Sequence, residues 1–195
     1  LHAKGRVTGA NGVILMRQSL AIFESLHEST PDDFDLARVL AVAYDRTGDV
    51  LIERTTEYGE ALRLFTRTVE VADKLLAADV HNVRIKKAKA YGLLGIGRSL
   101  EALKRPREAL APQLQAIEIM RSIFDADPTN DVGRFDASIA LVETGTTYLT
   151  LGDLDSAERR LTEGLGVISN AFLGDGAQAT PNKVAGTRFR RSPAT

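Results

Sequence analysis

The sequence of 195 residues contains no cysteine and no tryptophan. The lack of cysteine excludes disulfide bonds, thiolate zinc sites and cysteine nucleophiles, and it removes the usual indicator of the redox compartment. Charge of one sign is not in excess either, because 25 Lys and Arg stand against 26 Asp and Glu. Since a surface that binds nucleic acid usually carries a marked basic excess, we expect no nucleic-acid partner.

Long hydrophobic runs are also missing. No stretch approaches the roughly 18 to 20 apolar residues that a membrane-spanning helix needs, so we predict no membrane insertion of this segment. The chain starts at Leu1 without the regions of a signal peptide, and we interpret it as an excerpt of a longer protein or a processed chain. A cytoplasmic location is favoured, and an extracytoplasmic one follows if the parent protein is anchored in a membrane.

The feature that the sequence does have is an internal repeat. Ala61, Ala109 and Ala157 lie 48 residues apart, each in a short block of similar sequence. Residues 13–26 match residues 62–75 at an offset of 49, so the pattern starts with half a repeat. Four copies of one helix and three copies of its partner are therefore predicted.

Within each copy the apolar residues recur at helical spacing. Phe65, Val69, Ala72 and Leu76 step by 4, 3 and 4 residues, which places them along one face of a helix. Asp33, Asn82 and Asp131 are the predicted N-caps of the partner helices. With no strand pattern anywhere, the predicted fold class is all-α, with about seven helices.

The predicted organisation has three parts. An N-terminal extension covers residues 1–10, and a helical repeat domain covers 11–173, with a half-repeat at 11–30 and helix pairs at 33–78, 82–126 and 131–173. The C-terminal tail, residues 174–195, contains Pro181, Gly186 and Pro193, which cannot sustain another helix. We expect the tail, anchored by Phe189, to pack on the last helix, on the end of the concave surface or on a neighbouring chain.

Glycines recur at one position of the repeat. Gly48, Gly97 and Gly145 lie in the first helix of each pair, where a glycine costs about 0.5 to 1 kcal/mol relative to alanine. A close approach of the neighbouring helix explains such a cost at three equivalent positions. We therefore predict that these glycines lie at helix contacts, and that Ala109 is buried against Gly97.

The third copy resembles the tetratricopeptide motif, in which a large residue, a glycine, an aromatic, a turn glycine and small residues build two antiparallel helices. The residues that carry this resemblance are Leu141, Gly145, Tyr148, Gly152, Ala157, Leu161 and Gly164. In the second copy Lys104 replaces the turn glycine, and the first copy has one extra residue between its helices. The resemblance implies a right-handed superhelix of antiparallel helix pairs, a tetratricopeptide-like α-solenoid.

The period of 48 residues exceeds the usual period of about 34, so both helices are predicted to be lengthened. The segments Leu40–Tyr44, Gly48–Leu51 and Gln18–Glu24 are similar to long repeats that follow bacterial serine/threonine kinase domains. The resemblance covers residues 11–173 and implies a bacterial protein in which this region recognises or assembles other components of a larger signalling protein.

By the geometry of that family, the first helices line the concave side of the superhelix, where a partner binds. The residues expected there are Arg38, Asp45, Asp49, Lys87, Tyr91, Leu94, Arg98, Arg134, Val142 and Thr146. These residues depart from the Lys and Asn pattern with which chaperone-binding members hold a C-terminal carboxylate. The resemblance therefore implies another protein or peptide as partner, and a homo-oligomer through the terminal repeat stays open.

Motifs for catalysis and for cofactor or metal binding are lacking. His27 and His81 stand in different repeats, without the neighbouring ligands of a zinc helix. The glycines of Gly92-x-x-Gly95-x-Gly97 follow no strand, so packing is favoured over phosphate binding. We expect no enzyme, no metal site and no cofactor. The leading hypothesis is a protein-protein interaction scaffold, and the alternative is a sensor that binds a small ligand or peptide in the concave groove.

Overall fold

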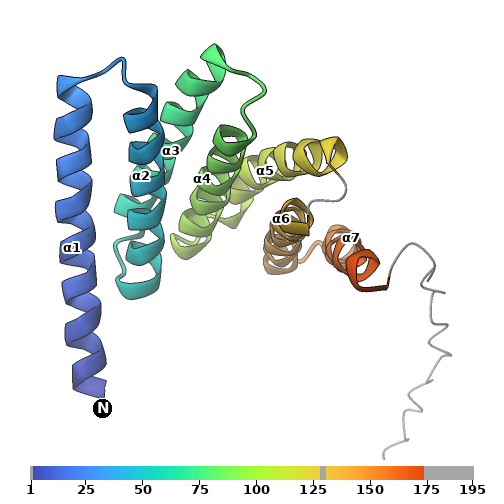
Figure 1. The fold of residues 1–195 in the computed structure, drawn as a ribbon. Coiled ribbons are helices and arrows are strands. Elements are labelled where there is room, and N and C mark those ends of the chain that lie inside the picture. The colour runs from blue at the N-terminus through green and yellow to red at the C-terminus, as the bar shows by residue number, and fades with distance from the viewer. Residues whose placement is uncertain (1, 128–130, 174–195) are drawn as a thin grey trace, which may run out of the picture.

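In a computed structural model, the chain forms an α-solenoid of consecutively packed helices (Figure 1). The structure describes residues 2–127 and 131–173, and these residues contain no strand. The helices are α1 (His2–Ser29), α2 (Phe34–Arg54), α3 (Tyr58–Ala78), α4 (Val83–Ala102), α5 (Pro106–Ala126), α6 (Asp131–Leu151) and α7 (Leu154–Leu173). The predicted all-α class is confirmed, while the predicted packing of the tail at 174–195 through Phe189 lies outside the described residues.

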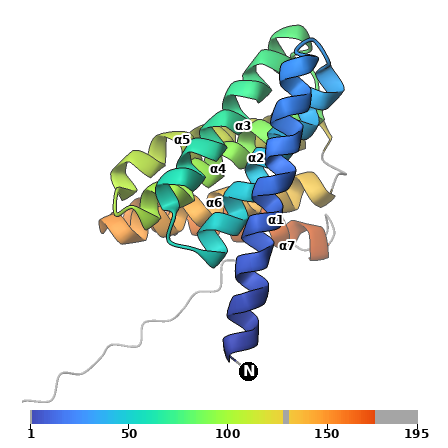
Figure 2. The same cartoon turned by 90° about the vertical axis from the view of Figure 1, so that its left-hand side faces the viewer.

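Helix α1 is longer than the repeat predicts. The half-repeat is expected at residues 11–30 after an extension at 1–10, whereas α1 begins at His2. No proline precedes residue 12, so every residue of this stretch has the backbone N–H that a helix needs. Its first turns extend beyond the neighbouring helices in both views (Figures 1 and 2).

Two of the three predicted N-caps are confirmed. The Asp33 carboxylate accepts a hydrogen bond from the backbone N–H of Leu36 at 2.9 Å, and the Asn82 side chain accepts one from Ile85 at 3.3 Å. Asp131, the third predicted cap, is instead the first residue of α6.

The turns after α4 and α6 share one geometry. The N–H of Arg105 bonds to the carbonyl of Leu100 at 2.8 Å, and the N–H of Asp153 bonds to that of Tyr148 at 3.0 Å. These six-residue closures are Schellman motifs, whose C′ residue adopts the left-handed conformation. Gly152 has a φ of 79°, and Lys104, which replaces the turn glycine, has a φ of 64°. The second copy therefore keeps the turn without its glycine.

The first helices of the pairs lie closer together than the second helices do. Helix α2 packs against α4, and α4 packs against α6, whereas the described parts of α1, α3, α5 and α7 do not pack closely on one another, although Arg121 of α5 forms an ion pair with Glu163 of α7. The helix axes also rotate along the array, so that α6 is seen nearly end-on where α1 is seen from the side (Figure 1). The face formed by α2, α4 and α6 is therefore the concave face.

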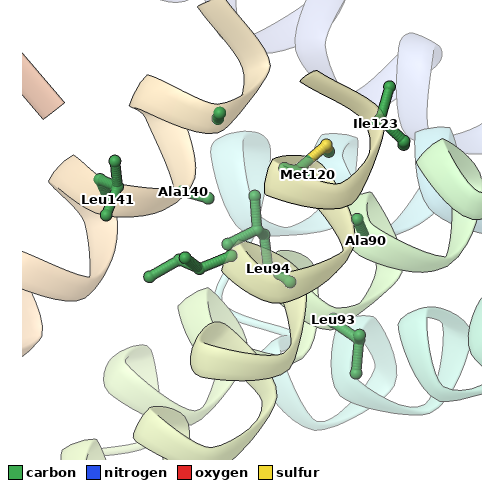
Figure 3. Packing of buried hydrophobic residues seen from close by; sticks show 10 residues of the cluster. Ala90, Leu93, Leu94, Met120, Ile123, Ala140 and Leu141 are labelled. Carbon is green, nitrogen blue, oxygen red and sulfur yellow. The ribbon is translucent and has the colours of Figure 1, made fainter. Parts of the chain in front are cut away.

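The core continues from pair to pair. One cluster joins α4, α5 and α6 through completely or nearly completely buried residues such as Leu94, Met120 and Leu141 (Figure 3). A second cluster joins α1, α2 and α3 around Leu51 and Phe65. Each helix thus buries its apolar stripe against the next one along the chain.

Phe65 fills the space between two glycines of different repeats. Its ring is completely buried. A Cβ atom added to Gly48 of α2 would lie 2.7 Å from the ring, and one added to Gly95 of α4 would lie 2.2 Å from it. The backbones of α2 and α4 therefore approach the ring at distances that only glycine permits.

The other repeat glycines also lie at helix contacts, as predicted. An added Cβ would lie 2.8 Å from Leu161 at Gly145 and 2.7 Å from Gln113 at Gly97. Ala109 is completely buried, but the atoms nearest to that Cβ of Gly97 all belong to Gln113, one turn further along α5. The predicted burial of Ala109 is confirmed, and the longer Gln113 side chain supplies the atoms nearest to Gly97.

Candidate functional site: a charged pocket on the concave face

A pocket of about 430 Å³ opens on the concave face where α2, α4 and α6 meet. It is called the groove pocket below, and it combines charged and apolar side chains. The lining residues are Asp45, Arg46, Asp49, Ile52 and Glu53 from α2, Tyr91, Leu94 and Arg98 from α4, and Ile139 and Glu143 from α6. One helix from each of the three pairs therefore contributes to the pocket.

Arg98 connects the three helices across this pocket. Its guanidinium group donates to Asp49 Oδ1 on α2 at 2.7 Å and to Glu143 Oε1 on α6 at 3.1 Å. The same group lies 5.7 Å from the centre of the Phe65 ring, a distance typical of a cation–π contact. Burial alone would lower the pKa of Arg98, but Glu143 and Asp49 raise it above its usual value. Arg98 therefore stays charged and fixes the two carboxylates.

Asp45 is the carboxylate without a partner in the groove pocket. It lies one helical turn before Asp49 and makes no ion pair or side-chain hydrogen bond with any described residue. Its Oδ1 atom is buried. Burial, together with the negative charge of Asp49, raises the pKa of Asp45 from 3.8 to about 6. The ionised form of Asp45 therefore lowers the stability of the folded state.

The two carboxylates that bind Arg98 are also affected by burial. Burial raises the pKa of Asp49 and of Glu143, and the positive charge of Arg98 offsets part of that rise. Glu143 uses Oε1 for Arg98, whereas its Oε2 atom is buried without a hydrogen-bond partner. The pocket therefore holds two buried carboxylate oxygens, one on Asp45 and one on Glu143, with unused acceptor capacity.

A second polar group lies beside the pocket, around the buried Asp136 of α6. The Tyr91 hydroxyl donates to Asp136 Oδ1 at 2.5 Å, and Lys87 Nζ lies 2.6 Å from Asp136 Oδ2. Burial and the hydrogen bond to Asp136 raise the pKa of Tyr91 above its usual value. These contacts hold the Tyr91 ring in place as one wall of the groove pocket.

About one helical turn after Arg98 on α4, Glu101 joins α5 and α6. Gln113 of α5 donates to Glu101 Oε1 at 3.2 Å, and the hydroxyl of Thr147 on α6 donates to the same oxygen. Gln113 and Thr147 are almost completely buried. The register places Gln113 at the position of Phe65 and Leu161 in the other repeats, so the middle repeat replaces an apolar contact with a polar one.

The structure brings half of the predicted surface residues into the pocket: Asp45, Asp49, Tyr91, Leu94 and Arg98. Leu94 differs from the expectation of an outward residue. It is completely buried and belongs to the core, because α5 and α6 pack against it (Figure 3).

The other predicted residues lie elsewhere on the concave helices. Lys87 is beside the pocket in its ion pair with Asp136. Arg38 pairs with Asp35 at 3.6 Å in the first turn of α2. Arg134 pairs with Asp131 at 3.7 Å and lies 5.7 Å from the centre of the Phe124 ring.

Val142 and Thr146 are exposed on α6 and do not line the pocket. The predicted surface is therefore divided. Its centre is a pocket with fixed charges, and outside the pocket Arg38 and Arg134 are partly buried while Val142 and Thr146 are exposed.

Sequence reasoning did not find the remaining lining residues, which are Arg46, Ile52, Glu53, Ile139 and Glu143. The sequence does contain a pattern that points to Glu53. Asp45, Asp49 and Glu53 follow one another at four-residue spacing and therefore form an acidic stripe on α2. No comparable signal existed for Glu143, which aligns with Gly95 and Arg46 in the other repeats.

Residues 2–127 and 131–173 contain no group of three or more His, Cys, Asp or Glu residues that could hold a metal ion. No described helix has the length and apolarity to cross a membrane. Three lysines stand close together on α4, at positions 86, 87 and 89; Lys87 pairs with Asp136 and Lys89 pairs with Asp73 of α3, each at 2.6 Å. These two lysines thus contact carboxylates of neighbouring helices.

Comparison with known proteins gives little further information. No protein-family model matches the chain, and no curated protein matches it. Among solved structures, BtubC (BKLC) from P. vanneervenii is similar over 94% of this chain and 99% of that chain, with 12% sequence identity and a TM-score of 0.22. A TM-score at this level carries no argument about function.

Proposed function

We propose that this chain is a non-catalytic interaction scaffold that binds a segment of another protein on its concave face. The observation that carries this proposal is the groove pocket itself. Three helices from three different repeats contribute to it, and Arg98 holds their charged side chains in place through ion pairs. Side chains fixed in this way need little ordering when a ligand binds, which favours recognition.

The assignment of the repeats to the tetratricopeptide type is part of the same proposal. It is supported by the contacts of Gly48 with Phe65, of Gly97 with Gln113 and of Gly145 with Leu161, which repeat at one position of each pair. It is also supported by the matching Schellman turns after α4 and α6. On this assignment the chain would serve as the recognition or assembly region of a larger bacterial signalling protein.

A second candidate function is a sensor for a small ligand. The volume of about 430 Å³ lies within the range of about 300 to 1,000 Å³ that is typical of small-molecule sites, and polar groups converge on it. The scaffold is preferred because α6, one of the three helices that form the pocket, carries further exposed apolar side chains outside it, such as Val142 and Leu149.

Selection from a random peptide library tests the proposal. Peptides that bind the chain are selected and then cross-linked to variants that carry a photo-reactive benzoylphenylalanine at one position. Val142 on the concave face is the test position, and Glu118, an exposed residue of α5, is the control. We expect cross-links at Val142 and none at Glu118. Selected peptides that cross-link only at Glu118, or a selection that yields no binder, would overturn the proposed function.

A further inference from the structure

The groove pocket has an excess of negative charge. Its lining contains four carboxylates, Asp45, Asp49, Glu53 and Glu143, against the two guanidinium groups of Arg46 and Arg98. The formal excess is two negative charges. An anionic ligand, such as a phosphate or a C-terminal carboxylate, would therefore be repelled, whereas a cationic ligand would be attracted.

The ion pairs within the pocket leave one carboxylate for a ligand. Arg98 is shared between Asp49 and Glu143 at 2.7 and 3.1 Å. Arg46 approaches Asp49 at 3.9 Å and is largely exposed to solvent. Asp45, by contrast, has no ion pair with a described residue, and its Oδ1 atom is buried at the pocket without a hydrogen bond.

The remaining walls of the pocket suit an aliphatic chain. Ile52 of α2 and Ile139 of α6 contribute apolar surface, and the partly buried Tyr91 of α4 adds an aromatic ring. A ligand that combines a methylene stem with a terminal cation would place its stem against these side chains and its charge at Asp45. Among amino-acid side chains, lysine and arginine have this form.

We propose that the groove pocket is the recognition site for a basic side chain of the bound peptide, and that Asp45 receives its positive charge. This inference rests on the proposed function, because it names the chemistry of the partner at the same site. Burial and the charge of Asp49 disfavour the ionised form of Asp45, and a cation bound there would offset this effect. A free alkylamine has the same chemistry, so the test includes both sources.

The probes are capped nonapeptides of alanine and serine with one variable central residue, and n-pentylamine as the free cation. Lysine, arginine, norleucine and glutamate are placed at the centre, and binding is followed by NMR titration of the full chain. Norleucine is the matched control, since it keeps the aliphatic stem and lacks the charge. We expect the lysine and arginine peptides to bind at least about tenfold more tightly than the norleucine peptide, and the glutamate peptide to bind least.

The matched protein variants are Asp45→Asn and Glu118→Gln. Asp45→Asn removes the charge while keeping the shape, so it should abolish the preference for lysine over norleucine. Glu118→Gln changes an exposed carboxylate on α5 and should keep the preference. Circular dichroism confirms that both variants are folded, so a lost preference is not a consequence of unfolding.

The outcomes separate the two proposals. If selected peptides cross-link at Val142 but the lysine and norleucine peptides bind equally, the inference is wrong and the proposed function stands. If pentylamine binds as tightly as the lysine peptide and depends on Asp45, the cation site is supported and its source is a free amine. If no selected peptide reaches the groove and neither cation binds, both proposals fail.

Discussion

Helices α4 and α1 show how position in the array decides burial. On α4, Leu94 is 0% exposed, whereas Leu15 on α1 is 64% exposed. Helix α4 contacts α2, α3, α5 and α6, while the described part of α1 contacts α2 alone. Helix α1 buries one face, as Val13 and Leu20 at 7% exposure show, while side chains on its other faces, such as Leu15, contribute little to stability.

The largest difference is expected for one substitution made in both helices. Leu94→Ala removes a completely buried side chain and should lower the free energy of unfolding by about 2 to 5 kcal/mol. Leu15→Ala removes a mostly exposed one and should change it by less than about 0.5 kcal/mol. Urea unfolding measures both values. Equal losses would show that α1 is covered in solution, for instance by a second copy of the chain.

Two glycine-to-alanine substitutions are expected to have smaller effects on stability, and these effects should be of opposite sign. Gly95→Ala on α4 places a Cβ 2.2 Å from the Phe65 ring and should cost about 1 to 3 kcal/mol through overpacking. Gly12→Ala on α1 meets nothing within 4 Å and should stabilise the helix by about 0.5 to 1 kcal/mol. Thermal unfolding of both variants gives the signs. A stabilising Gly95→Ala would contradict the close approach of α4 to Phe65.

The groove pocket predicts a modest dependence of stability on pH. In the folded state the pKa of Asp45 is about 6, compared with a usual value of 3.8. Between about pH 4 and pH 6 the folded state therefore binds more protons than the unfolded state. The contribution of Asp45 to stability should therefore rise as the pH falls from 7 towards 4, and Asp45→Asn should raise the Tm at pH 7 and reduce the pH slope. Glu118→Gln is the control. An unchanged slope in Asp45→Asn would show that Asp45 is well solvated.

The smallest effect concerns the two matching turns. Lys104 adopts the left-handed conformation that Gly152 adopts in the last pair. Because a left-handed non-glycine residue is strained, Lys104→Gly should stabilise the chain by up to about 1 kcal/mol, while Gly152→Ala should destabilise it by about 1 to 2 kcal/mol. Thermal unfolding distinguishes the two signs. A destabilising Lys104→Gly would indicate that the Lys104 side chain makes a contact that offsets the strain.

Much of the fold could be predicted because the repeat encodes it locally. The 48-residue period and the apolar stripes predict the helices, and the recurring glycines predict the helix contacts. The partners of the glycines were harder to predict. Gly95 has no glycine at the equivalent position in the other repeats, and its contact with Phe65 joins two different pairs. Such contacts depend on how pairs stack, which a single repeat does not encode.

The candidate site could be predicted only in part. Repeat register placed Asp45, Asp49 and Arg98 on the concave side, and the structure brings them together in the groove pocket. Glu143 was missed because its repeat equivalents are Gly95 and Arg46, so no pattern singled it out. The absence of an ion-pair partner for Asp45 could not be predicted either. Which carboxylates pair with Arg98 depends on how α2, α4 and α6 pack together, and the sequence of one repeat does not contain this information.

NMR titration of the chain with a selected peptide, followed through the isoleucine methyl groups, tests most directly whether the concave face is the binding surface. Ile52 and Ile139 line the groove pocket, whereas Ile14 and Ile22 are exposed on α1. The account predicts chemical-shift changes at Ile52 and Ile139 and none at Ile14 and Ile22. Changes confined to Ile14 and Ile22 would contradict it, because they would assign binding to the exposed face of α1.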